Sequence, residues 1–249
     1  MLALSSSFLL IALLYSMVGF GGGSSYAAIL AASGVAYTAI PKISLLCNLL
    51  VVTGGSYHFG RQGHFSWKLI LPFAVASVPM AFAGGMLPLD KQTFFLLMTG
   101  ALVLCGLRIL FLPDRRPEEI RTPSIAVSLL VGGVLGLLSG LVGIGGGIFL
   151  SPLLINLGWA RSKNAAAVAS VFILVNSLAG LAGQFTKNPD MAPLISHWPL
   201  FAAVFIGGQV GSRVGSHQSV PHAWVQKSTG ILTLFIGIKL LVDAVHPSH

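Results

Sequence analysis

The chain has 249 residues, of which 55% are hydrophobic and only 8% are charged. A soluble domain carries about 25% charged residues, so the composition excludes a soluble enzyme or a soluble binding module. The formal net charge is +8, which fits a positive-inside bias with attraction to anionic lipid, or an anion path through the protein. Apolar runs of about 20 residues recur along the chain and predict an all-α polytopic membrane protein.

The first half is predicted to hold four long spans and one short segment. The short segment is rich in small residues and comes second, directly after a run of glycines. In chain order the five segments are 2–18, 24–38, 43–57, 67–87 and 94–111. A charged, proline-punctuated stretch, PDRRPEEIRTP at 113–123, follows them and predicts a cytoplasmic linker outside the hydrocarbon.

The second half repeats this order, with a short segment again following a run of glycines. Asn48 corresponds to Asn176, and both follow the short segment of their half. We therefore expect two homologous transmembrane repeats, 1–112 and 124–249, with eight long spans and two short or re-entrant segments in all. The segments of the second repeat are 124–142, 148–159, 164–184, 198–215 and 224–245, with a polar loop at 186–197.

The basic residues decide between parallel and inverted repeats. If the short segments do not reverse the chain, the repeats are parallel and the 14 Lys and Arg residues divide almost evenly between the two sides. If each short segment reverses the chain, the repeats are inverted and the division is ten to four. Cytoplasmic loops carry an excess of Lys and Arg, so we favour inverted repeats with both termini on the outer face. The basic side then holds Arg61, Lys68, Arg108, Arg115, Arg116, Arg121, Arg161, Lys163, Arg213 and Lys227, and the other side holds Lys42, Lys91, Lys187 and Lys239.

The acidic residues avoid the middle of every predicted span. Carboxylates within spans are the usual proton relays and cation ligands, so this placement argues against a cation channel and against a carboxylate-based proton pump. The histidines lack metal-ligand spacing, and no nucleotide-binding motif occurs, so we expect no metal, no cofactor, no nucleic-acid partner and no enzymatic activity. The six acids are Asp90, Asp114, Glu118, Glu119, Asp190 and, near the end of the last span, Asp243.

The two glycine runs, GFGGGSS at 19–25 and GIGGG at 143–147, are the candidate substrate site. So many glycines cannot hold a rigid helix, and the helix that begins after each run has free N–H groups that bind anions. The alternative is close helix packing, which better suits the ridges Gly132/Gly136/Gly140 and Gly207/Gly211/Gly215. Those ridges would equally suit the face of a homo-oligomer. The site residues expected at the breaks are Gly21, Gly22, Gly23, Ser24, Ser25, Gly145, Gly146, Gly147, Ile148 and Ser151.

Polar and basic residues near the breaks extend the candidate site. Asn48 and Asn176 are amides within spans, with either a ligand role or an interhelical hydrogen-bond role. Basic residues near the short segments and at a span end either signal topology or form a vestibule that draws in anions. The vestibule candidates are Lys42, Arg161, Lys163 and Arg213.

The stretch GIGGGIFLSPLLINLGWARSKNAAAVASVFILVNSLAGL, from Gly143 to Leu181, resembles the TauE/SafE family of sulfite and organosulfur-anion exporters. Its glycine triplet, proline, basic turn and Asn-Ser pair are similar to the family pattern. The first-half copy lacks a proline shortly after its triplet, where Ala27 or Ala28 stands. The resemblance covers essentially the whole chain and implies export of sulfite or of organosulfonates.

Three functions remain open from the sequence. The favoured one is a secondary transporter in the bacterial inner membrane that exports small sulfur-containing anions by alternating access about a midplane site. A passive anion channel would use the same pore. A membrane-embedded enzyme or a non-transporting membrane subunit is the third alternative, and an enzyme would require catalytic acids or metal ligands at membrane depth.

Overall fold

The computed structural model describes residues 1–111, 120–217, 230–231, 234–235 and 237–238. The described residues form helices and connecting turns, and no strand occurs among them. The helices are α1 (Leu2–Ser16), α2 (Gly23–Ala32), α3 (Ile40–Arg61), α4 (Trp67–Met86), α5 (Lys91–Phe111), α6 (Ile125–Val142), α7 (Gly147–Asn156), α8 (Ser162–Lys187), α9 (Ala192–Ser196) and α10 (Trp198–His217).

The segments predicted from the sequence each coincide with a helix up to α10, while the segment at 224–245 and most of the linker lie outside the described residues. Several predicted boundaries are wrong: α2 ends at Ala32 and α3 at Arg61, where the sequence predicts ends at 38 and 57. In the structure α3 begins at Ile40, and Pro41 lies in its first turn. Proline is tolerated there because the N–H groups of the first turn have no partner within the helix. The predicted polar loop at 186–197 is also partly helical, because α8 continues to Lys187 and α9 follows.

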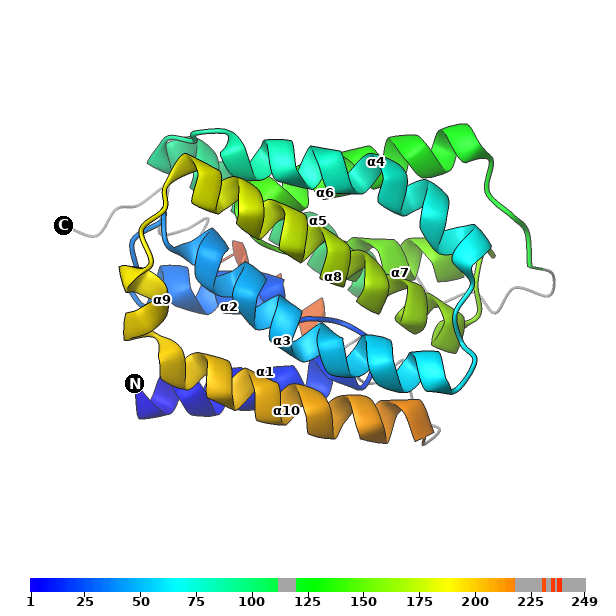
Figure 1. Cartoon of the computed structure of the whole chain (residues 1–249), viewed down its shortest axis with the longest axis horizontal. Coiled ribbons are helices and arrows are strands. Elements are labelled where there is room, and N and C mark those ends of the chain that lie inside the picture. The colour runs from blue at the N-terminus through cyan, green and yellow to red at the C-terminus, as the bar shows by residue number, and fades with distance from the viewer. Residues whose placement is uncertain (112–119, 218–229, 232–233, 236, 239–249) are drawn as a thin grey trace.

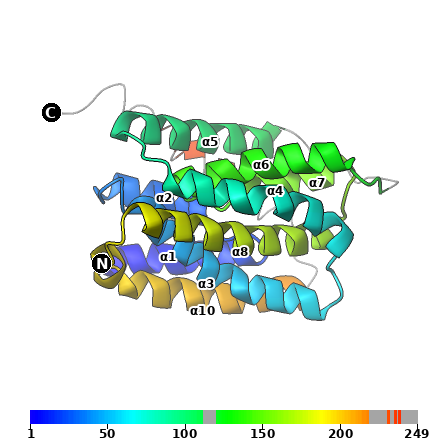
Figure 2. The same cartoon turned by 45° about the horizontal axis from the view of Figure 1, so that its top comes forward.

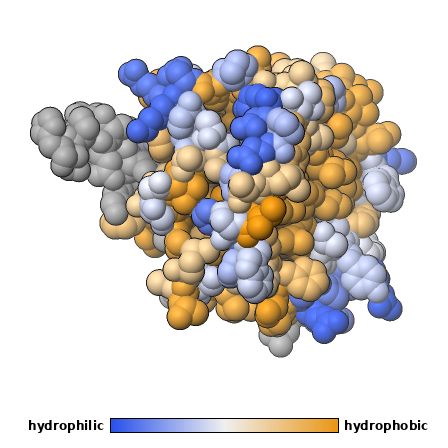
Figure 3. Space-filling view, turned by 60° about the vertical axis from the view of Figure 1, so that its left-hand side comes forward, coloured by the Kyte–Doolittle hydropathy of each residue, from blue (hydrophilic) through white to orange (hydrophobic). Residues whose placement is uncertain are grey.

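Among the described residues, four helices are long and apolar enough to cross a membrane by length and composition: α3, α4, α6 and α8. Shorter apolar helices accompany them, including α1, α2 and α7. Large hydrophobic side chains such as Leu71 and Leu130 are exposed on the outer faces of these helices, and hydrophobic residues cover much of the flank of the molecule (Figure 3). The protein is therefore an integral membrane protein whose outer surface suits lipid.

Helices α3 and α8 pack against each other through the middle of the structure and run in opposite directions (Figures 1 and 2). Helix α4, from the first half of the chain, packs on α6 and α8 of the second half. Helix α10, from the second half, packs on α1 and α3 of the first half. One helix of each half thus packs mainly against helices of the other half, and the two halves form one bundle.

The two glycine ridges allow α6 to pack closely on α4 and α10 to pack closely on α1. This confirms the interpretation that the ridges serve helix packing. Any Cβ added along the first ridge, on α6, would overlap a carbonyl group of α4, and any Cβ along the second, on α10, would overlap one of α1. The backbones therefore approach more closely than side chains would allow. The facing carbonyls belong to Phe73, Ser77 and Ala81 for Gly132, Gly136 and Gly140, and to Leu9, Leu13 and Met17 for Gly207, Gly211 and Gly215.

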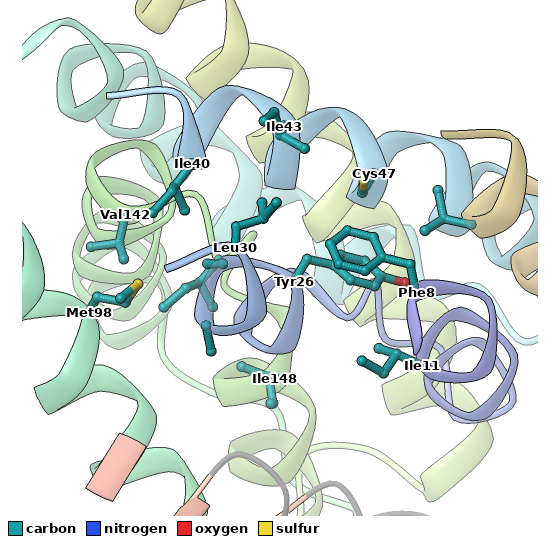
Figure 4. Close-up of a cluster of buried hydrophobic side chains, with 14 of the residues drawn as sticks. Phe8, Ile11, Tyr26, Leu30, Ile40, Ile43, Cys47, Met98, Val142 and Ile148 are labelled. Atoms are coloured by element: carbon teal, nitrogen blue, oxygen red, sulfur yellow. The ribbon is translucent and has the colours of Figure 1, made fainter. Parts of the chain in front are cut away.

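The short helix α2 lies inside the hydrophobic core instead of on the surface (Figure 4). Tyr26 of α2 is fully buried and stacks on Phe8 of α1, with ring centroids 4.6 Å apart. Leu30 of α2 joins the same cluster, together with side chains of α3, α5 and α7. Protein therefore covers the first turns of α2, whereas its last residue, Ala32, is exposed.

Asp90 starts α5 at one end of the bundle. Its carboxylate accepts hydrogen bonds from the Thr93 hydroxyl at 2.6 Å and from the Thr93 backbone N–H at 2.9 Å. This is the geometry of a helix N-cap. These hydrogen bonds, the hydroxyl first, lower the pKa of Asp90 below its usual value. The acid is exposed and serves the helix end, as expected for a loop carboxylate.

We expect Gly136→Ala to destabilise the protein and Gly133→Ala to leave its stability unchanged or improved. A Cβ at Gly136 overlaps the Ser77 carbonyl, so α4 and α6 must separate, at a cost of about 1–3 kcal/mol. A Cβ at Gly133 meets Met80 Cγ at an ordinary 3.7 Å, and alanine favours a helix by up to about 1 kcal/mol. Thermal unfolding of the two purified variants in detergent would measure this, and equal midpoints would contradict the close packing.

Candidate functional site

The two glycine runs form real breaks in the helices. The chain leaves α1 at Ser16 and enters α2 at Gly23, and it leaves α6 at Val142 and enters α7 at Gly147. Gly22 and Gly146 occupy equivalent N-cap positions with φ of 85° and 73°. Side chains other than glycine rarely adopt this left-handed conformation. Each break therefore creates a new helix N-terminus within the protein, as the sequence predicts.

The two breaks face each other across Asn48 of α3. A Cβ placed on Gly23 would lie 2.8 Å from the Ile144 carbonyl oxygen, so the first break touches the second. The Asn48 amide lies against Gly21 and Gly23 of the first break, and a Cβ on Gly145 of the second would lie 2.6 Å from its Nδ2 atom. One side chain thus reaches both breaks, which are more than 120 residues apart in the chain.

The Asn48 amide is buried without a hydrogen-bond partner. Its side chain is 0% exposed, and neither Oδ1 nor Nδ2 has a partner among the described residues. Leaving a buried polar group unpaired costs about 1–3 kcal/mol, and buried polar groups are paired in the great majority of cases. This amide therefore has unused donor and acceptor capacity beside both glycine breaks.

Asn176 differs from Asn48 although the two are equivalent in the sequence. Asn176 is buried in α8, and its Nδ2 donates a 2.7 Å hydrogen bond to the Phe172 carbonyl of its own helix, while Oδ1 has no partner among the described residues. Among the α8 side chains at the breaks, Ile173 contacts the positions of Gly21, Gly145 and Gly147, and Phe172 contacts that of Gly146. The α8 side chains nearest to Asn48 are therefore apolar.

Two serines that the sequence reasoning missed hold the breaks in place. The Ser44 hydroxyl lies 2.8 Å from the Gly23 carbonyl oxygen and 2.8 Å from that of Gly143, so it joins the two breaks. Ser170 donates to the Gly19 carbonyl at 3.0 Å and also lies 2.9 Å from the Ala166 carbonyl. The signal available for Ser44 was its position one helical turn before Asn48. No comparable signal marks Ser170.

The other residues expected at the breaks are buried around them. Ser25 of α2 pairs with Tyr15 of α1, with 2.6 Å between their hydroxyl oxygens. The neighbouring Ser24 hydroxyl is buried and has no partner among the described residues. Ile148 and Ser151 are buried in α7, at 5% and 2% exposure. The structure therefore gathers these residues in the interior beside the glycine breaks.

The four vestibule candidates lie at two opposite ends of the bundle. Lys42 is near the start of α3, where it contacts the chain just after the end of α8. Lys163 lies at the start of α8 and donates a 3.3 Å hydrogen bond to the Ser216 carbonyl near the end of α10, close to Arg213. Arg161 is the N-cap of α8. These residues do not form a single vestibule.

The end that holds Lys163 is rich in basic groups. Asn164 of α8 donates a 3.2 Å hydrogen bond to the His64 carbonyl, which fixes the loop between α3 and α4 against it. The pKa of His64 lies below its ordinary value, first because burial disfavours the charged imidazolium and second because Lys163 is a nearby cation. His64 is thus favoured as a neutral group at this end.

Similar proteins identify the chain. Residues 4–240 match the family described as "Sulfite exporter TauE/SafE". The chain belongs to the TauE/SafE family. It is 31% identical over 244 residues to "Probable membrane transporter protein y4hK" of Sinorhizobium fredii, covering 96% of this chain and 98% of the relative. It is 27% identical over 191 residues to "Probable membrane transporter protein MJ0441" of Methanocaldococcus jannaschii, covering 73% of this chain and 71% of the relative.

Membership confirms the resemblance seen in the sequence and makes the protein a membrane transporter. Among the described residues, no group of three or more His, Cys, Asp or Glu side chains is placed to hold a metal ion. The buried site at the TauE/SafE glycine breaks is instead made of backbone, hydroxyl and amide groups.

We expect Ser44→Ala to lower the free energy of unfolding by about 1–3 kcal/mol, because two buried carbonyls lose their shared donor. Ser33→Ala is the control, since the Ser33 hydroxyl bonds the Ile29 carbonyl at an exposed helix end. Thermal unfolding of the two variants in detergent measures the difference. Wild-type stability in Ser44→Ala would show that the hydroxyl does not hold the breaks together.

Proposed function

We propose that this TauE/SafE protein is a secondary transporter that exports small sulfur-containing anions, such as sulfite or organosulfonates, across the bacterial inner membrane. The observation that carries the proposal is the Asn48 amide, which is fully buried, has no partner among the described residues and lies against both glycine breaks. The description of the family, "Sulfite exporter TauE/SafE", supports the substrate class.

The anionic group would bind at the two helix N-termini. The first N–H groups of a helix have no partner within it, and the N-terminus carries about half a positive charge. Helices α2 and α7 begin at Gly23 and Gly147, next to each other across Asn48. The Asn48 Nδ2 group adds N–H donors from the side. Such a site binds an oxyanion without a buried arginine or lysine.

The buried hydroxyls would complete this site. Ser24 lies in the first turn of α2, and Ser25 follows it. Gly21, Gly22, Gly145 and Gly146 let the backbone approach the anion closely, because they carry no Cβ. Ile173 would face the apolar part of an organic anion from α8. Asn176 and Ser151 are placed in this proposal as supporting groups and not as direct ligands, because Asn176 already bonds its own helix.

Transport would proceed by alternating access between inverted repeats. The antiparallel direction of α3 and α8, and the exchange of α4 and α10 between the halves, support that relation. Asn48 is closed off from solvent in this structure, so a carrier has to open to one side at a time. The excess of basic residues at the Arg161 and Lys163 end supports a cytoplasmic location for it. Assembly into a homo-oligomer stays a prediction.

We expect Asn48→Asp to reduce sulfite counterflow in proteoliposomes by at least roughly 100-fold, because a carboxylate would repel the anion and has no N–H donor to offer. Asn48→Leu keeps the volume and removes the polar group, and we expect a loss of similar size. The measurement is exchange of radiolabelled sulfite against unlabelled sulfite, sulfoacetate, sulfate and chloride.

Thr53→Val is the matched control, because Thr53 is exposed on the same helix and bonds only the Leu49 carbonyl of that helix. This variant should transport as the wild type does. Wild-type counterflow in Asn48→Asp would refute the anion site. Anion flux without any acceleration by unlabelled anion on the opposite side would show a channel instead of a carrier.

We expect Ser33→Cys and Leu157→Cys to react with a membrane-impermeant maleimide from opposite sides of the membrane. Ser33 and Leu157 are the equivalent C-cap residues of α2 and α7, and both are exposed. Inverted repeats place them on different faces, with Ser33 outside. The variants are made in a background with Cys47 and Cys105 replaced by alanine, and labelling is compared in intact and permeabilised cells. Labelling of both from the same side would show parallel repeats.

A further inference from the structure

A cavity of about 250 Å³ lies at the end of the bundle that is poorer in basic residues. It is built between the start of α3, the end of α8 and the turn before α5, and Lys42 and Lys187 both line it. No carboxylate is among the described residues that line it. Two cations without a lining acid make this cavity suited to an anion.

Lys42 is held in place as a buried cation. It is 2% exposed, and its Nζ donates to the Asn188 carbonyl at 2.6 Å and to the Asp190 carbonyl at 2.9 Å. An ammonium group has three donors, and the third has no acceptor among the described residues. The Asp190 carboxylate accepts from the Ala192 backbone N–H at 2.9 Å and does not line the cavity. Lys42 Nζ also lies 5.1 Å from the centroid of the Phe185 ring in a cation–π contact, and Asp190 is near enough to stabilise its charge. A ligand in the cavity would meet the Lys42 ammonium beside these contacts.

Lys187 and Gln184 face the same cavity from α8. Lys187 is exposed, and its Nζ donates a 3.2 Å hydrogen bond to the Leu87 carbonyl. Gln184 is 1% exposed, and its Nε2 donates to the Gly140 carbonyl at 2.9 Å, whereas its Oε1 has no partner among the described residues. The cavity thus offers two ammonium groups for an acid and one buried acceptor for an O–H or N–H donor.

The remaining wall is largely apolar. Leu89, Phe94 and Leu141 line the cavity, and Pro41 forms part of its boundary towards the second glycine break. A Cβ on Gly143 would lie 2.7 Å from the Pro41 Cα atom, so the cavity and the break are separated by one layer of chain. At about 250 Å³, the cavity has room for an anion that carries a short carbon chain.

We propose that this cavity is a binding site for a short organic anion on the outer side of the transport path, with its acid group on Lys42 and Lys187, its carbon chain against Phe94 and Leu89, and an O–H or N–H donor on Gln184 Oε1. The inference rests on the proposed function, because it makes the cavity the last site at which the substrate binds after it leaves the site at Asn48. It narrows the substrate class from small sulfur-containing anions to organosulfonates that carry an O–H or N–H donor.

The test is binding of ³⁵S-labelled 3-hydroxypropane-1-sulfonate to the full chain in nanodiscs, measured by scintillation proximity. Unlabelled propane-1-sulfonate lacks the donor, and sulfate lacks the carbon chain, so we expect each to compete more weakly than the unlabelled probe, sulfate by roughly tenfold or more. Lys187→Gln should weaken binding roughly tenfold, because it removes a charge-assisted hydrogen bond.

Lys91→Gln is the matched control, because Lys91 is an exposed lysine at the same end that does not line the cavity. It should bind the probe as the wild type does, and melting temperatures check that both variants fold. Equal affinity in Lys187→Gln and Lys91→Gln would overturn the proposal. Competition by sulfate as strong as that of the unlabelled probe would overturn it too, since the cavity would then recognise charge alone.

Asn48→Asp separates this proposal from the proposed function. The cavity proposal expects this variant to bind the probe although it does not transport. Binding lost in Asn48→Asp but kept in Lys187→Gln would assign the label to the central site, so the cavity proposal would fail and the proposed function would stand. Binding that depends on Lys187 in a protein that moves none of these anions would leave the cavity site standing and refute the transport function.

Discussion

The fold depends on the need to cover two helix ends inside the membrane. Unpaired backbone groups cost several kcal/mol each in hydrocarbon, so irregular backbone at membrane depth must be buried in protein or line a cavity. Both glycine breaks are therefore enclosed. Helices α3 and α8 flank them, Ser44 and Ser170 bond their carbonyls, and α2 lies within the hydrophobic core. The long helices therefore cover the free N-terminal ends of the short helices α2 and α7.

Close backbone packing makes this enclosure possible. The glycine ridges on α6 and α10 let those helices rest against the carbonyl groups of α4 and α1. Because α4 and α10 each pack on the opposite half of the chain, neither half can move as a block without shearing one of these contacts. In the proposed transport cycle, a movement that opens the buried Asn48 would slide helices along these small-residue surfaces.

Charge and polarity divide the molecule along its length. The centre holds a neutral amide and helix N-termini, which attract an anion without binding it as strongly as a buried cation would. The two ends hold lysine and arginine side chains, with Lys42 buried at one end and Lys163 tied to α10 at the other. This arrangement suits the proposed anion transport, in which the substrate is released after it binds.

The sequence by itself determined the approximate places of the described helices other than α9, the glycine breaks and the family, because apolar runs and glycine clusters are local properties of the chain. It also placed Asn48 at the site. Only the tertiary structure decided that Asn48 and not Asn176 touches both breaks, that Ser44 joins them, and that Lys42 is buried. Lys42 bonds the Asn188 carbonyl 146 residues away, and Asn48 meets Gly145 across the bundle. Such contacts depend on how helices from the two halves cross, which no local pattern encodes.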